Sequence, residues 1–228
     1  MPVLQRVLTI IAEIARDLPY HGLMLNERYI HHYFSNRLQE HDDHAPNLLN
    51  VMGPAAGIML HPEWPTYKEA TGLDFGRYRK IDGQYRPVDD GQKGGFLDFA
   101  VGDYNSPEIG IEFKLKPSWS NTGIVYDFVK LLDSRNRSLM AVVSFNVILR
   151  PNGLPMGNYV QYFQDLAHAA YQEAVDRLGH WCCGDERRRW FIFSEIATDA
   201  RRNWLCDNAN GVFGPIEQIP VPPANAGD

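Results

Sequence analysis

The chain has 228 residues, of which 44% are hydrophobic and 22% are charged, and its formal net charge at pH 7 is -6. This composition is typical of a soluble globular protein, and the length favours one domain with a sizeable core. The negative net charge argues against tight nonspecific binding of nucleic acid, although a local acidic site can still attract phosphate through a bound cation.

The first periodic segment runs from Val3 to Leu18, where apolar residues recur at helical spacing and predict a packing helix. Charged residues interrupt this segment at Arg6, Glu13 and Arg16, so neither a signal peptide nor a membrane span is expected. The odd number of cysteines, three, favours reduced thiols and a cytoplasmic location.

A second helix is predicted from Asn26, a favoured N-cap residue, to about Gln39. Its apolar face consists of Ile30, Tyr33, Phe34 and Leu38. Glu27 lies in the first turn, where a carboxylate stabilises the positive end of the helix dipole.

Two clusters of potential metal ligands raise the question of a zinc site. They consist of His31, His32, His41 and His44, and of His180, Cys182, Cys183 and Cys206. The histidine spacing fits no compact zinc pattern, and adjacent cysteines point to opposite sides of an extended chain. We therefore expect solvated histidines at the end of the helix and buried free thiols.

Two segments precede the centre of the chain. Residues 46–71 are rich in glycine, proline and methionine and are predicted to be mostly loop. Residues 78–87 are predicted to form a strand that bends at Asp82 and Gly83, a pair typical of hairpin turns.

The centre of the chain is the segment Gly94–Lys116, whose β-branched and aromatic residues predict two strands joined by a turn at Asn105–Pro107. Asp98 interrupts the first strand between two apolar residues, and Glu112 interrupts the second strand in the same way. Burying an isolated carboxylate is costly, so each should have a compensating partner. Strand alternation places Glu112 and Lys114 on one face, so the site would hold two acids and an amine if Asp98 faces them.

Asp98, followed on the next strand by Glu112-Phe113-Lys114, resembles the motif of the PD-(D/E)XK nuclease superfamily, which has the restriction-endonuclease-like fold. Leu97 stands where the motif's name has proline. The resemblance implies that Asp98 and Glu112 bind Mg²⁺, for which Mn²⁺ can substitute, and that Lys114 assists the attacking water in phosphodiester cleavage.

The resemblance also implies further site residues. The carbonyl of Phe113 is a candidate metal ligand, and so is Glu27, because a helix before the hairpin often carries such a glutamate. Lys116, Lys130 and Arg79 are candidate contacts to nucleic acid. An ordinary exposed lysine at position 130 and a purely dipole-stabilising Glu27 are the alternatives.

Beyond the hairpin, a helix is predicted from Ile124 to Asp133, with Asp127 and Lys130 on the side away from its buried stripe. Residues 138–149 form a nearly continuous apolar run, which predicts an inner strand covered on both faces. A helix over 159–178, a short strand over 190–196 and a proline-rich extended tail over 214–228 complete the prediction.

The predicted fold class is α/β, as a single domain with a restriction-endonuclease-like core. This core would be a central mixed β-sheet flanked by helices in the order αβββαβ, over residues 26–150. An added N-terminal helix precedes it, and a C-terminal helix and strand extension over 151–213 follows it. The expected partner is nucleic acid, with DNA preferred over RNA; a homodimer is left open, and no membrane partner is expected.

Three alternatives to a DNA-cleaving enzyme stay open at this point. The charged hairpin residues could form an exposed ion pair of little energetic value. The nuclease-like scaffold could be a non-catalytic binding or assembly module, which the acidic net charge favours. An α/β enzyme acting on a small molecule would need a deep pocket instead of an open cleft.

Overall fold

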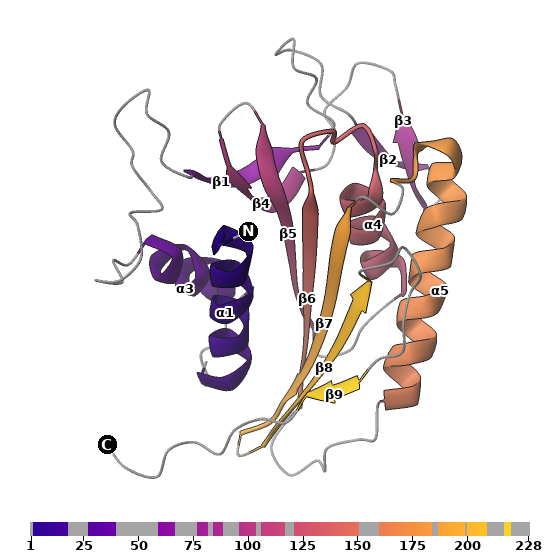
Figure 1. Ribbon diagram of the computed structural model, residues 1–228. Coiled ribbons are helices and arrows are strands. Elements are labelled where there is room, and N and C mark those ends of the chain that lie inside the picture. The colour runs from indigo at the N-terminus through magenta and orange to yellow at the C-terminus, as the bar shows by residue number, and fades with distance from the viewer. Residues whose placement is uncertain are drawn as a thin grey trace.

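In the computed structural model of the chain, a mixed sheet has helices on both faces (Figure 1). The structure describes residues 2–17, 27–39, 59–66, 77–81, 84–88, 96–103, 106–116, 121–150, 160–183, 187–198, 200–208 and 217–219. The helices among them are α1 (Pro2–Asp17), α3 (Arg28–Gln39), α4 (Asn121–Leu132), α5 (Val160–Leu178) and a short 3-10 helix (Gly179–Trp181). The strands are β1 (Met59–Pro65), β2 (Arg77–Ile81), β3 (Gln84–Val88), β4 (Phe96–Gly102), β5 (Pro107–Lys116), β6 (Ala141–Leu149), β7 (Arg188–Ile196), β8 (Arg201–Asn208) and β9 (Glu217–Ile219).

The main sheet has the strand order β1-β4-β5-β6-β7-β8-β9. Its three central strands, β5, β6 and β7, are parallel to one another, whereas the strands on either side of them pair antiparallel. All nine residues of β6 are buried. The apolar run is therefore an inner strand covered on both faces, as its composition predicts.

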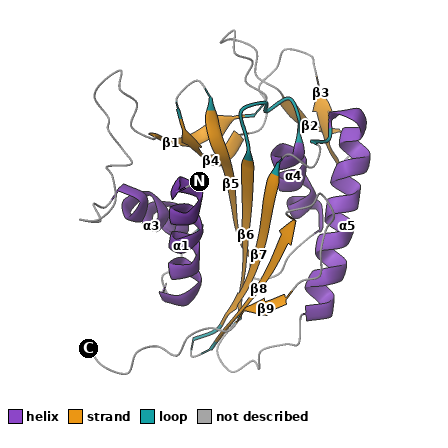
Figure 2. Ribbon diagram, in the orientation of Figure 1, coloured by secondary structure: helices purple, strands orange, loops and turns teal. Residues whose placement is uncertain are grey.

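Helices α1 and α3 cover one face of this sheet, and α4 and α5 cover the other (Figure 2). Alternate residues of β6 follow this division, because Val143, Phe145 and Val147 pack in the core with α1 and α3, whereas Ile148 packs with α4 and α5. The predicted apolar stripe of α3 is also confirmed, since Ile30, Phe34 and Leu38 are buried and Tyr33 packs partly against them.

Two predictions about the strands before the hairpin were wrong. Residues 59–65 of the expected loop form β1, which pairs with β4 at the edge of the main sheet. Two prolines obscure this strand in the sequence, yet proline is tolerated at an edge, where a backbone N–H is not needed for pairing. Residues 78–87, predicted as one bent strand, instead form β2 and β3, which pair antiparallel with each other in a separate sheet, as the hairpin signal of Asp82 and Gly83 indicated.

The hairpin itself is confirmed, because β4 and β5 pair antiparallel from Phe99 with Ile111 to Gly102 with Pro107. The register shifts between Val101 and Gly102. Gly102 has a φ of 136°, and a Cβ added to it would lie 2.7 Å from the Glu108 nitrogen, so this bulge requires glycine.

The C-terminal part extends the sheet beyond the predicted short strand. Strand β7 runs from Arg188 to Ile196, and β8 and β9 continue the sheet after it. Residues 217–219 of the expected tail therefore pair with β8. Among the described helices, none combines the length and hydropathy that crossing a bilayer requires.

Candidate functional site

The candidate site lies where β4 separates from β5. The two strands pair as far as Phe99, while β4 stays paired with β1 to Phe96. Beyond the last pair, a side chain replaces the missing strand partner, because the Phe113 N–H donates to Asp98 Oδ2 at 2.7 Å. Asp98 thus reaches across the gap to the backbone of the strand that carries Glu112.

Glu27, which directly precedes helix α3, supplies a second carboxylate to the same edge of β5. The Leu115 N–H donates to Glu27 Oε2 at 2.8 Å, two residues beyond Phe113. Alternate N–H groups of a strand point to the same edge, so Asp98 and Glu27 line this edge side by side. The Glu27 carbonyl also accepts the Ile30 N–H at 2.9 Å, which fixes the residue at the start of α3.

The histidine next to this edge is His31. Its Nε2 lies 3.6 Å from Asp98 Oδ2, and its ring centroid lies 5.2 Å from that of Phe99 and 5.5 Å from that of Phe113. His31 is therefore half-buried against the aromatic core rather than solvated as expected, whereas His32 is exposed. The positions of His41 and His44 lie outside the described residues.

Glu112 points to the other face of the sheet, where α4 covers it. Its side chain is 2% exposed, and Lys130 Nζ lies 2.5 Å from its Oε1. The same ammonium group donates to the Phe96 carbonyl at 2.9 Å, at the end of β4 that has left β5. Lys130 therefore links α4 to β5 through Glu112 and to β4 through the Phe96 carbonyl.

Lys114 is held by the same helix. Its Nζ lies 2.9 Å from Asp127 Oδ2, and Asp127 Oδ1 lies 3.3 Å from Lys130 Nζ. The result is a chain of alternating charges in the order Lys114, Asp127, Lys130 and Glu112. Its buried members are at most 5% exposed, and only Lys114, with 20% of its side chain exposed, reaches solvent.

The prediction that Asp127 and Lys130 lie on the side of α4 away from its buried stripe was wrong. Both are buried, because α4 packs against the sheet with one side and against α5 with another. Lys130 also pairs with Glu112 and Asp127, so a contact from its ammonium group to nucleic acid requires these bonds to be exchanged.

The charges of the site act on one another. Burial raises the pKa of Glu112 well above its usual value, Lys130 lowers it, and the like charges of Asp98 and Asp127 raise it further. Burial lowers the pKa of Lys114, but Asp127, Glu112 and Glu27 outweigh burial, so its pKa is raised. The pKa values of Glu112 and Lys114 therefore depend on charges from both sides of the sheet.

The pKa of Lys130 follows the same balance. Burial alone lowers it, and the nearby carboxylates, chiefly Glu112 and Asp127, raise it by more. The ammonium form of Lys130 is thus part of the folded structure at neutral pH.

Two polar residues of β6 adjoin the site, and sequence reasoning missed them. Ser144 pairs in register with Glu112, and Asn146 pairs with Lys114. Both are buried, and Asn146 Nδ2 donates to Ser144 Oγ at 2.9 Å. The signal in the sequence was the pair of polar residues within an otherwise apolar strand.

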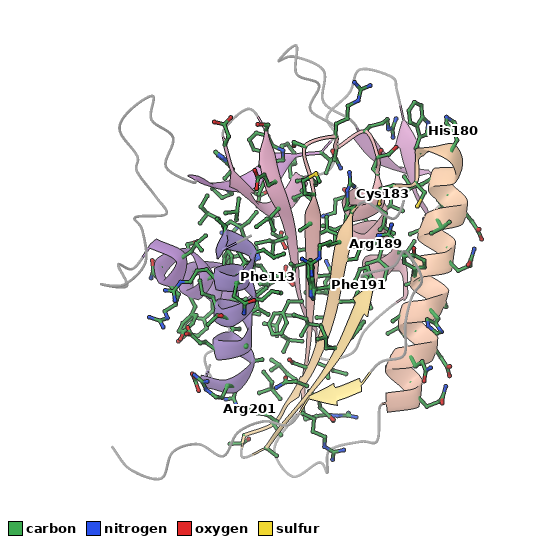
Figure 3. The ribbon with its side chains drawn as sticks, viewed as in Figure 1. Phe113, His180, Cys183, Arg189, Phe191 and Arg201 are labelled. Carbon is green, nitrogen blue, oxygen red and sulfur yellow. The ribbon has the colours of Figure 1, made fainter. Side chains whose placement is uncertain are left out.

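The predicted site residues fall on two sides of the sheet: Asp98 and Glu27 bond to the β5 backbone on the side of α3, whereas Glu112, Lys114 and Lys130 lie on the side of α4. Figure 3 shows Phe113 on the α3 side of the sheet and Phe191 on the α5 side, which marks the two faces that the site joins. Arg79 lies in β2 and Lys116 ends β5, but their side chains lie outside the part of the chain that is described.

Within the described residues, no group of three or more histidine, cysteine, aspartate or glutamate side chains is arranged to hold a metal ion. The cysteines that are described, Cys182 and Cys183, are free thiols. Cys183 is buried, as predicted, and Cys182 is partly exposed, while the side chain of Cys206 is not described.

Comparison of the chain with protein-family models, curated proteins and solved structures found no match. The function of the site is therefore inferred from its own residues and their geometry.

Proposed function

We propose that the protein is a Mg²⁺-dependent phosphodiesterase of the PD-(D/E)XK type that hydrolyses nucleic acid, with DNA as its preferred substrate. The observation that supports this proposal is that the motif residues occupy neighbouring positions where β4 separates from β5, with Asp98 on the side of α3 and Glu112 and Lys114 on the side of α4. Asp98 bonds to the Phe113 backbone, and its charge acts on Glu112, beside which Lys114 projects.

The order of the elements supports the proposal. Helix α3, strands β1, β4 and β5, helix α4 and strand β6 come in this order along the chain, with the separate pair β2 and β3 inserted between β1 and β4, and their four strands are neighbours in the sheet. The first two pairings are antiparallel and the last is parallel. This arrangement is similar to the αβββαβ core that the resemblance implies, with α1 and the segment from α5 to β9 as additions.

The donor atoms of the motif residues are of the kind that a hard divalent cation binds. Asp98 and Glu112 offer carboxylate oxygens, the Phe113 carbonyl lies between Glu112 and Lys114 in the chain, and Glu27 is next to Asp98 along β5. The charge of Asp98 raises the pKa of Glu112, and a bound cation would relieve this repulsion. When bound, Mg²⁺ would polarise the phosphodiester and acidify the attacking water.

The amine of the motif has a separate task. Lys114 is the lysine of the network that reaches solvent, so substrate can approach it, whereas Lys130 is enclosed. An ammonium group donates three hydrogen bonds and accepts none, so Lys114 orients the attacking water and neutralises charge that develops on phosphorus.

The experiment that tests the proposal is a cleavage assay on plasmid, single-stranded DNA and RNA with Mg²⁺, Mn²⁺ or Ca²⁺. The wild-type protein should cut DNA with Mg²⁺ or Mn²⁺ but not with Ca²⁺, whose coordination is larger and looser. Asp98→Ala and Lys114→Ala should abolish cleavage, and Glu27→Ala should weaken it less. A wild type that cuts none of these substrates would exclude the proposed activity.

One observation favours a second candidate, a non-catalytic nuclease-like binding or assembly module. Lys130 already neutralises Glu112, and Lys114 already pairs with Asp127, so the acids have partners without any metal ion. Calorimetric titration with Mn²⁺ separates the two candidates, because the enzyme should bind the ion in the wild type and lose it in Asp98→Ala. A wild type without Mn²⁺ binding would favour the binding module.

A further inference from the structure

Asp127 is the one residue of the charge network that contacts both lysines. Its Oδ2 lies 2.9 Å from Lys114 Nζ and its Oδ1 lies 3.3 Å from Lys130 Nζ. Its own side chain is 2% exposed. Each carboxylate oxygen thus faces a different ammonium group.

Stability alone gives a weak reason for this arrangement. Removing charges from water is costly, and buried ion pairs are often no more stable than apolar side chains of the same size. Lys114 could also extend into solvent from the end of β5, since a fifth of its side chain is already exposed. Instead, a buried carboxylate on a separate helix holds its ammonium group over the sheet.

We propose that Asp127 is a positioning residue of the phosphodiesterase, which holds the ammonium group of Lys114 beside Glu112. The inference rests on the proposed function and adds to it a residue on α4 that the motif does not contain. A lysine has four rotatable bonds in its side chain, so without a fixed partner its amine samples many positions. Lys130 on the other oxygen keeps the Asp127 carboxylate from turning away.

The test compares the full-length wild type with Asp127→Asn, Asp127→Glu and a matched control, Asp133→Asn. Asp133 is also a fully buried aspartate at the end of the same helix, and it pairs with Arg135 at 2.8 Å, away from the motif residues. Asp127→Asn should lower kcat about 100-fold, the loss expected when a reacting group is misplaced by about 1 Å, with KM almost unchanged. Asp127→Glu, which keeps a carboxylate, should recover part of kcat, and Asp133→Asn should keep the wild-type kcat.

A second measurement does not depend on cleavage. Limited acetylation followed by peptide mass spectrometry should label Lys114 faster in Asp127→Asn than in the wild type and at the wild-type rate in Asp133→Asn. Mn²⁺ binding, followed by calorimetry, should persist in Asp127→Asn, because Asp127 is not one of the proposed ligands. Thermal melts confirm that each variant is folded at the assay temperature.

Two results would overturn the inference while leaving the proposed function intact. In the first, the wild type cuts DNA, Asp98→Ala does not, and Asp127→Asn keeps the wild-type kcat. In the second, Asp127→Asn and Asp133→Asn lose kcat equally, in step with their loss of stability. If the wild type cuts no substrate, the proposed function fails and this inference fails with it.

Discussion

At the scale of single residues, the candidate site contains charged side chains that are almost completely buried. Lys130 has an exposed side-chain fraction of 5%, and its ammonium group meets two carboxylates and one backbone carbonyl. A buried group of this kind is tolerated only when nearly all its hydrogen-bonding capacity is used. Removing one member therefore leaves the others without compensation.

We expect Lys130→Met to lower the free energy of unfolding by about 3 kcal/mol, because breaking a buried pair leaves Glu112 and Asp127 without their shared cation. Urea denaturation measures the loss. The double variant Lys130→Met with Glu112→Gln should recover part of it, since the unpaired carboxylate is then gone. If the single variant loses less than about 1 kcal/mol, the ion pairs of Lys130 contribute no more to the free energy of unfolding than exposed ion pairs do.

A thiol offers a pH-dependent test outside the candidate site. The interaction with Cys182 lowers the pKa of the Cys183 thiol. Burial raises this pKa but is outweighed with the help of Arg187 and Arg189, giving a value of about 6. Figure 3 shows Cys183 near Arg189, whose Nη2 lies 3.6 Å from the thiol sulfur. An unfolded cysteine titrates near the ordinary value of 9.0.

Because the folded pKa of Cys183 lies below the unfolded one, the folded protein releases its proton first as pH rises. The stability contribution of Cys183 should therefore grow between pH 6 and pH 9 and vanish as pH falls below 6. Urea denaturation under reducing conditions at several pH values should show a wild-type advantage over Cys183→Ser that increases across this window. A difference that does not change with pH would contradict the lowered pKa.

At the scale of elements, one arginine stabilises the connection between α4 and β6 through hydrogen bonds to backbone carbonyls. The guanidinium of Arg187, at the start of β7, donates to the carbonyls of Leu131, Asp133, Asn136 and Leu139 at distances between 2.8 and 2.9 Å. Arg187 is 4% exposed, so these carbonyls depend on it in place of water. The arginine thereby also fixes the C-terminal end of the helix that carries Asp127 and Lys130.

Arg187→Lys should lower the free energy of unfolding by about 2 kcal/mol, because a single ammonium group cannot reach all four carbonyls and leaves buried acceptors unsatisfied. Hydrogen exchange should show faster exchange at the backbone of residues 133–140, with β6 itself still protected. Exposed Arg188 provides the matched control, since Arg188→Lys should change stability by less than about 0.5 kcal/mol. Equal effects at the two positions would contradict this role of Arg187.

At the scale of the whole molecule, net charge affects the proposed binding of nucleic acid. The formal charge of -6 repels a polyanion, and the candidate site itself contains more carboxyl groups than ammonium groups. Binding of DNA should therefore depend on a divalent cation that neutralises the site, in contrast to proteins that bind through a basic surface.

We expect a fluorescently labelled DNA duplex to bind in Ca²⁺, which should occupy the site without supporting cleavage, and to lose affinity at least about tenfold in EDTA at the same ionic strength. Fluorescence anisotropy measures both. Asp98→Ala should remove the difference between the two conditions. Equal affinity in Ca²⁺ and EDTA for the wild type would favour the metal-independent binding module.

Much of the fold could be predicted because its elements are locally consistent. The period of α1, the apolar run of β6 and the turn-separated strands β4 and β5 each identify one structure in a short window. The pattern of Glu112, Phe113 and Lys114 also places two charged residues on one face, since strand alternation depends only on the backbone. These features follow from neighbouring residues alone.

Other features depended on contacts that no short window contains. Strand β1 is stable despite its prolines because β4 pairs with it at the sheet edge, and β2 and β3 pair only with each other. The burial of Asp127 and Lys130 follows from the packing of α4 against both the sheet and α5, whereas the helical period predicted an exposed side for them. The period of a helix identifies its most apolar side, but the partners that cover its other sides come from distant parts of the chain, so only the tertiary structure could place these two charges at the site.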